Sequence, residues 1–144
     1  MAKGNRYRLY EAEKDFERLY FSSPEAAQGW LSWVCRTKWW KDRSTIKHID
    51  LNYPTYSMSG SWKVDDSLGR IDIYAFSLDA MTLCHEMAHL LDWRPRTTNQ
   101  EKCHDAHFAG TELAVIARYM GADWRVKMEA AFLDHGVKWE EGIT

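Results

Sequence analysis

Hydrophobic and polar residues recur along this chain in patterns that separate helices from strands. The clearest helical pattern runs from Leu78 to Leu91, which contains no glycine or proline and repeats leucine and methionine at helical spacing. Ser77 is the predicted N-cap of this helix, and Asp79 lies in its first turn, where a carboxylate complements the helix dipole. Pro95 disfavours helical geometry in the residue before it, so the helix is expected to end ahead of that point.

A second helical pattern begins near Asn99. Thr98 and Glu101 form a T-x-x-E capping box, which predicts a helix start at this position. Residues at helical spacing then form one face that is expected to point inward: His104, Phe108, Thr111, Val115 and Tyr119. Gly121 is the predicted stop of this helix.

The remaining segments predict the scaffold. Strands are expected at residues 7–13, 49–53, 60–65 and 70–76. The last two are joined by a short turn, which favours a hairpin. Helices are expected from Pro24 to about Lys38 and from Asp123 to Gly136. This order predicts an α+β fold, with a small antiparallel or mixed sheet and the helices on one side of it.

The composition limits the cellular compartment and the classes of binding partner that are expected for this chain. At 144 residues and 45% hydrophobic, with no repeat or linker, the chain is expected to form a single domain spanning residues 1–144. A formal charge of −2 gives no general attraction to nucleic acid or membrane, and no apolar run approaches the ~20 residues of a membrane span. Three cysteines and no apolar signal core favour a cytoplasmic protein without a disulfide framework. The oligomeric state is left open.

The chemistry centres on an H-E-x-x-H motif at residues 85–89, inside the first predicted helix. His85 and His89 project from one helix face about one turn apart, the separation at which both reach a single zinc ion. Glu86 is then placed to act as general base toward a water on that metal. Cys84 and Cys103 each precede a candidate histidine and point about 100° away around a helix, so both are interpreted as core thiols.

The residues alone leave the third metal ligand open. A metzincin would have glycine and histidine where this chain has Asp92 and Pro95, so that class is excluded. A thermolysin-like site would take a glutamate from the following helix, for which Glu101 and Glu112 are candidates. His104, on the inward face of the second helix, would instead complete a three-histidine site. Asp92 has a separate possible role, as a hydrogen-bond acceptor for a ligand imidazole.

A longer motif resembles a known family. The segments that carry it are His85-Glu86-x-x-His89 and His104-x-x-x-Phe108-Ala109-Gly110-Thr111-x-Leu113. Together they are similar to the H-E-x-x-H … H-G-P-E-F-x-G-x-x-L pattern of small metallohydrolases from actinobacteria and their phages. More distantly they resemble SprT-like and minigluzincin peptidases. The resemblance covers roughly residues 70–120 well and the N-terminal half in outline.

This resemblance implies a compact zincin-like core with one zinc per chain. It also implies that His104, on the helix after the motif helix, is the third ligand. The chain departs from the pattern twice, with Asp105 at the usual glycine and His107 at the usual glutamate. The second departure makes His107 a rival ligand or an additional group of the site.

These features predict a zinc metallopeptidase or related metallohydrolase that cleaves a peptide or amide bond of a peptide or protein substrate. Two alternatives are a catalytically inactive zinc-binding interaction module and a peptidase acting on DNA-associated proteins. The second alternative depends on residues 36–43, which mix cations with tryptophans. A solvated helix end is the plainer interpretation, so nucleic acid is not an expected partner. His107 and Tyr119 are the candidates for stabilising the oxyanion.

Overall fold

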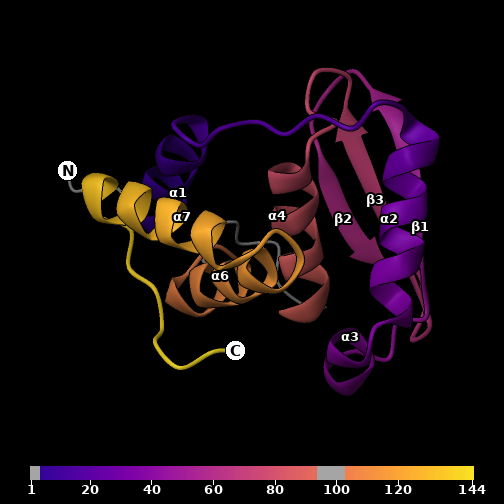
Figure 1. The fold of residues 1–144 in the computed structure, drawn as a ribbon. Coiled ribbons are helices and arrows are strands. Elements are labelled where there is room, and N and C mark those ends of the chain that lie inside the picture. Colours follow the sequence, from indigo (N-terminus) through magenta and orange to yellow (C-terminus); the bar gives the residue numbers. More distant parts are fainter. Residues whose placement is uncertain (1–3, 94–102) are drawn as a thin grey trace. The chain divides into compact units, whose positions relative to one another are not determined.

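The computed structural model describes residues 4–93 and 103–144, which belong to two compact units. We call Arg18–Trp93 the sheet unit, and Met1–Glu17 with Arg94–Thr144 the terminal unit. Both units contain helices and the sheet unit contains all the strands among the described residues, so the predicted α+β class is confirmed (Figure 1). Among these residues, no helix is both long enough and apolar enough to cross a membrane.

The sheet unit is built on a three-stranded mixed sheet with the strand order β1-β3-β2. β1 (His48–Thr55) pairs in parallel with β3 (Leu68–Tyr74), and β3 pairs antiparallel with β2 (Gly60–Lys63). The predicted hairpin is therefore confirmed, and the open choice between an antiparallel and a mixed sheet is decided in favour of the mixed one. β1 and β2 form the two edges.

One face of the sheet is buried. Along β3, Gly69, Ile71 and Ile73 are buried, whereas the alternate residues are half-buried. This face packs against α4 (Ala80–Leu91), the helix that contains the H-E-x-x-H motif. Gly69 permits the close approach, because a Cβ atom there would lie 3.1 Å from Cδ1 of Leu90. A larger residue would push α4 away from the strand.

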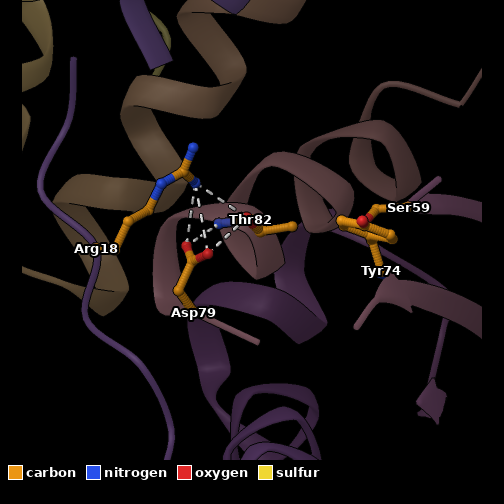
Figure 2. A network of polar contacts seen from close by, with 5 residues as sticks. All are labelled: Arg18, Ser59, Tyr74, Asp79 and Thr82. Atoms are coloured by element: carbon orange, nitrogen blue, oxygen red, sulfur yellow. Dashed lines mark hydrogen bonds and ion pairs between the residues drawn. The ribbon is translucent and has the colours of Figure 1, made fainter. Parts of the chain in front are cut away.

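A partly buried network of an ion pair and hydrogen bonds fixes the start of α4, as Figure 2 shows. The N-cap is Asp79, so the prediction of Ser77 is wrong. The Asp79 carboxylate accepts hydrogen bonds of 2.9 Å from both the backbone N–H and the hydroxyl of Thr82. Arg18 lies 3.4 Å from the same carboxylate. A carboxylate with these partners is a stronger cap than an isolated hydroxyl, which explains why the helix starts at Ala80.

α2 (Pro24–Arg36) starts as predicted, with a proline in its first turn. It ends at Arg36 because Thr37 adopts extended backbone and caps a separate short helix, α3 (Lys38–Arg43). Gln28 of α2 hydrogen-bonds the backbone of β1, donating to the Ile49 carbonyl and accepting from Leu51 N–H, both at 2.8 Å. The Gln28 side chain therefore satisfies two backbone groups at the β1 edge of the sheet, which are then not available to pair with another strand.

The terminal unit contains three described helices, and α7 contacts both others. The prediction of a strand at residues 7–13 is wrong, because this segment lies in α1 (Asn5–Lys14). Leu9, Ala12 and Glu13 are its buried residues, and their spacing of three and four is helical. α7 (Ala122–His135) has Gly121 as its N-cap and starts one residue before Asp123, the predicted start. It ends as predicted at Gly136, which has a left-handed φ of 70°.

α6 (Ala106–Tyr119) starts later than predicted. Asp105 is its N-cap and accepts a 3.1 Å hydrogen bond from the backbone N–H of Phe108. His104 therefore lies just before this helix, and the prediction that it sits on the inward face of the helix is wrong. The predicted start near Asn99, with its capping box, lies outside the described residues.

The C-terminal segment packs closely on α6. The backbone N–H of Glu140 donates a 2.9 Å hydrogen bond to the carbonyl of Ala106. A Cβ atom on Gly110 would lie only 2.5 Å from the carbonyl oxygen of Glu140, so any side chain there would displace the segment. This contact is a packing reason for the glycine within the Phe108-Ala109-Gly110 motif.

Candidate metal centre

α4 brings two of the predicted ligands together. The ring centroids of His85 and His89 lie 4.9 Å apart, and the rings offer nitrogen atoms within 4.8 Å of one another. His85 is buried and His89 is half-buried. Neutral imidazole nitrogens four residues apart on a helix are a donor pair well suited to zinc and other first-row divalent ions. This pair therefore fits the metal that the motif predicts.

Glu86 is held from the sheet. Its carboxylate is buried, and Oε1 accepts a 2.8 Å hydrogen bond from the hydroxyl of Ser61. Ser61 lies on the edge strand β2, opposite Ile71 of β3. That register places Ser61 on the buried face of the sheet, toward α4, because residues directly opposite one another in an antiparallel pair share a face. The carboxylate of the candidate base thus has a fixed orientation.

Sequence reasoning missed Ser61. The sequence carried no usable signal, because Trp62 and Val64 are the apolar residues of this segment and alternation would have placed them, not Ser61, on the inward face. Nothing in the local pattern connects Ser61 to Glu86, which lies 25 residues further along the chain. Only the packing of α4 on the sheet brings the two side chains together.

The terminal unit holds His104 firmly. His104 is only 1% exposed, and its backbone carbonyl accepts a 3.0 Å hydrogen bond from the side-chain amide of Asn5. The hydroxyl of Tyr10 lies 3.2 Å from Nε2 of its ring. The rings of Tyr10 and Phe108 each meet the imidazole edge-on, with centroids 5.1 Å away. Asn5 and Tyr10 lie on α1, and neither was identified from the sequence: Tyr10 falls in the strand predicted at residues 7–13, and Asn5 precedes that strand.

The rival ligand His107 lies in a different environment. It is exposed on the first turn of α6, and its backbone carbonyl accepts a 3.0 Å hydrogen bond from the Thr111 hydroxyl. The ring of a resident metal ligand is normally fixed by its surroundings, and His104 is buried whereas His107 is exposed. The surroundings within this unit therefore favour His104 over His107.

Two glutamates were also candidates for the third ligand. Glu112 lies on α6, fully buried, with a carboxylate oxygen within 4.8 Å of one from Glu13 on α1. Glu101 lies outside the described residues. Glu112 is therefore a buried carboxylate of the same unit as His104, and it stays an alternative ligand of the thermolysin-like type.

Three further predictions concern residues near the motif. Asp92 is the C-cap residue of α4, and its role toward a ligand imidazole stays a prediction. Cys84 is buried, as expected for a core thiol, whereas Cys103 is only half-buried. Tyr119 ends α6, about 20 Å along the helix axis from Ala106, which argues against its acting beside His104.

Residues 36–43, which mix cations with tryptophans, contain one buried tryptophan and several exposed charged side chains. Trp40 is fully buried and donates a 2.8 Å hydrogen bond from its indole N–H to the carbonyl of Ile46. Lys38 is exposed and pairs with Asp42 at 2.6 Å, and Arg43 stacks on the ring of Trp39 at 4.1 Å. These contacts are those of a solvated helix end with one tryptophan in the core.

Comparison of the chain with family models, curated proteins and solved structures finds no match. The inference of function therefore depends on the residues and their surroundings.

Proposed function

We propose that the protein is a zinc-dependent metallopeptidase or related amide hydrolase. The observation that supports this most strongly is the buried Glu86 carboxylate, which Ser61 holds at 2.8 Å on the helix that pairs His85 with His89. A helix with only a structural role has no need of a buried glutamate oriented beside two clustered imidazoles. The proposed ligands are His85, His89 and His104, with one zinc per chain.

When bound, zinc lowers the pKa of a coordinated water toward about 7 and polarises the carbonyl of the substrate. The protein itself supplies the proton transfers. Glu86 accepts a proton from the attacking water as oxygen bonds to the carbonyl carbon. It then delivers that proton to the amine nitrogen as the carbon–nitrogen bond breaks, so the carboxylate is ionised again at the end. The products are a carboxylic acid and an amine. Ser61 keeps the carboxylate in one orientation through both transfers.

A peptide is the substrate class that the sheet favours. β2 is an edge strand, and its Ser61 contacts the candidate base directly. An extended peptide that pairs with the edge of β2 would gain backbone hydrogen bonds and lie beside the strand that holds Glu86. At the opposite edge, Gln28 already bonds the backbone of β1. The resemblance to zincin-like peptidases favours the same substrate class.

The test is a peptide-library cleavage assay with the zinc-loaded protein. Glu86→Gln should keep zinc and the fold but lose hydrolysis by roughly 10²–10⁴-fold, because only the base is removed. Glu25→Gln changes an exposed glutamate at the start of α2 and serves as the matched control. Cleavage by Glu86→Gln at the wild-type rate would contradict the proposal. Full zinc binding without any cleavage by the wild type would favour an inactive zinc-binding module.

A further inference from the structure

We propose that Tyr10 is a positioning residue of the metal centre. Its hydroxyl accepts a hydrogen bond from Nε2–H of His104, which leaves Nδ1 as the nitrogen that binds the metal. The proposal relies on the function proposed above for the identity of His104 as a ligand. The observation on which it is built is the 3.2 Å contact between the Tyr10 hydroxyl and Nε2, whose direction follows from the chemistry of imidazole.

The ring of His104 is constrained on several sides within the terminal unit. Asn5 holds its backbone carbonyl, and the rings of Tyr10 and Phe108 meet the imidazole edge-on. The side chain is almost fully buried, so rotation of the ring would require these neighbours to move. The imidazole therefore keeps one orientation, with Nε2 facing the Tyr10 hydroxyl.

The chemistry of imidazole then decides the direction of the hydrogen bond. A neutral imidazole carries one N–H and one lone pair, and a metal takes the lone pair. If Tyr10 donated to Nε2, the lone pair on that nitrogen would already be engaged and Nδ1 would carry the proton. Neither nitrogen would then suit a metal. Metal-binding histidines usually donate their other N–H to an oxygen, and the tyrosine oxygen meets that requirement.

Asn5 and Tyr10 have separate roles in this arrangement. Asn5 holds the backbone at His104, and it also bonds both the N–H and the carbonyl of Lys138 at 2.8 and 3.2 Å. Loss of Asn5 would therefore loosen the C-terminal segment as well. Tyr10 acts on the ring itself. A Tyr10→Phe change removes one oxygen and keeps the aromatic packing, so it isolates the hydrogen bond.

The first measurement is zinc affinity by competition with a chromophoric chelator. Tyr10→Phe should weaken zinc binding roughly 10- to 100-fold, the range seen when a hydrogen-bond partner of a ligand is lost. Tyr7→Phe is the matched control, because Tyr7 lies on the same helix and is 45% exposed. It should change the affinity less than twofold. Thermal unfolding of both variants shows whether the fold is kept. Unchanged or tighter zinc binding by Tyr10→Phe would overturn the proposal.

The second measurement needs neither zinc nor activity. Long-range ¹⁵N NMR of the metal-free wild type at pH 8, where an ordinary imidazole is neutral, reports which nitrogen of His104 is protonated. We expect the Nε2–H tautomer in the wild type and a mixture in Tyr10→Phe. A predominant Nδ1–H tautomer in the wild type would overturn the proposal even if Tyr10→Phe failed to fold.

These results separate the two proposals. If Tyr10→Phe loses zinc affinity but no peptide is cleaved, the positioning role stands and the proposed peptidase function fails. If cleavage depends on Glu86 while Tyr10→Phe binds zinc normally, the function stands and the positioning role fails. If His104→Ala binds zinc as tightly as the wild type, the positioning role fails because its ligand has been misassigned.

Discussion

The hydroxyl of Ser61 donates a 2.8 Å hydrogen bond to Oε1 of Glu86, and this bond joins the edge strand β2 to the H-E-x-x-H helix. The strand proposed to pair with a peptide and the carboxylate proposed to act on that peptide are thus directly connected. A change in the position of β2 would therefore move the Glu86 carboxylate or break its hydrogen bond to Ser61. This relationship leads to the first prediction.

Ser61→Ala should lower kcat roughly 10- to 100-fold and leave zinc affinity unchanged, because hydrogen bonds to charged groups contribute about 1.5–3 kcal/mol. Ser61→Thr keeps the hydroxyl and should restore most of the rate. Ser59→Ala is the control for local packing, since the Ser59 hydroxyl accepts a 2.9 Å hydrogen bond from the backbone of Tyr74 and contacts a different part of the sheet. Steady-state kinetics on a cleaved peptide provide the measurement. Equal rates for Ser61→Ala and the wild type would show that Glu86 needs no such support.

Zinc content is the second prediction. Elemental analysis after purification without chelator should find one zinc per chain. His85→Ala and His89→Ala should each lose most of it, because the remaining nitrogen ligands hold the ion weakly. His48→Ala is a suitable control, since His48 is exposed on β1 and pairs with Asp50 at 2.6 Å. Full occupancy in both H-E-x-x-H variants would place the metal elsewhere.

The third prediction concerns stability. Asp79→Ala removes the N-cap of α4 and leaves Arg18 and Thr82 without their shared partner. We expect a loss of about 1–3 kcal/mol in the free energy of unfolding, measured by urea denaturation. Ser77→Ala should stay within about 0.5 kcal/mol of the wild type, because Ser77 is not the cap. If Ser77→Ala were the more destabilising change, the helix would start where the sequence alone predicted.

Elements whose apolar residues repeat at a regular spacing could be predicted from the sequence. The H-E-x-x-H helix and the strands β1 to β3 follow from the spacing of apolar residues, which reports burial on one face. The helix α1 was not predicted. Its helical signal is the spacing of Leu9 and Ala12, which covers only three residues, and the neighbouring residues favoured a strand instead. Only the structure, which shows which residues of this segment are buried, makes its helical form evident.

Long-range partners explain the remaining differences. The sequence favoured Ser77 as the cap of α4, whereas Asp79 fills that role with a partner, Arg18, that lies 61 residues earlier. The contacts Ser61–Glu86 and Tyr10–His104 join residues 25 and 94 positions apart. No periodicity encodes such pairs. The motif therefore predicts the candidate ligands and base, while the residues that contact them are evident only from the fold.

The identity of the third ligand is the last prediction. His104 lies before α6 with its carbonyl held by Asn5 and its ring beside Tyr10, whereas His107 is exposed three residues later. A buried ring with fixed neighbours can present a nitrogen without a large loss of side-chain entropy, which an exposed ring would have to incur on binding.

His104→Ala should therefore weaken zinc binding by orders of magnitude in a chelator competition titration, and His107→Ala should leave it within a few-fold of the wild type. Thermal unfolding of the metal-free variants is the control, because a loss of fold would also lower affinity. Glu112→Gln tests the thermolysin-like alternative: it should keep zinc if three histidines bind the metal, since Glu112 is then no ligand. Loss of zinc in His107→Ala or Glu112→Gln, with normal binding by His104→Ala, would contradict the three-histidine assignment.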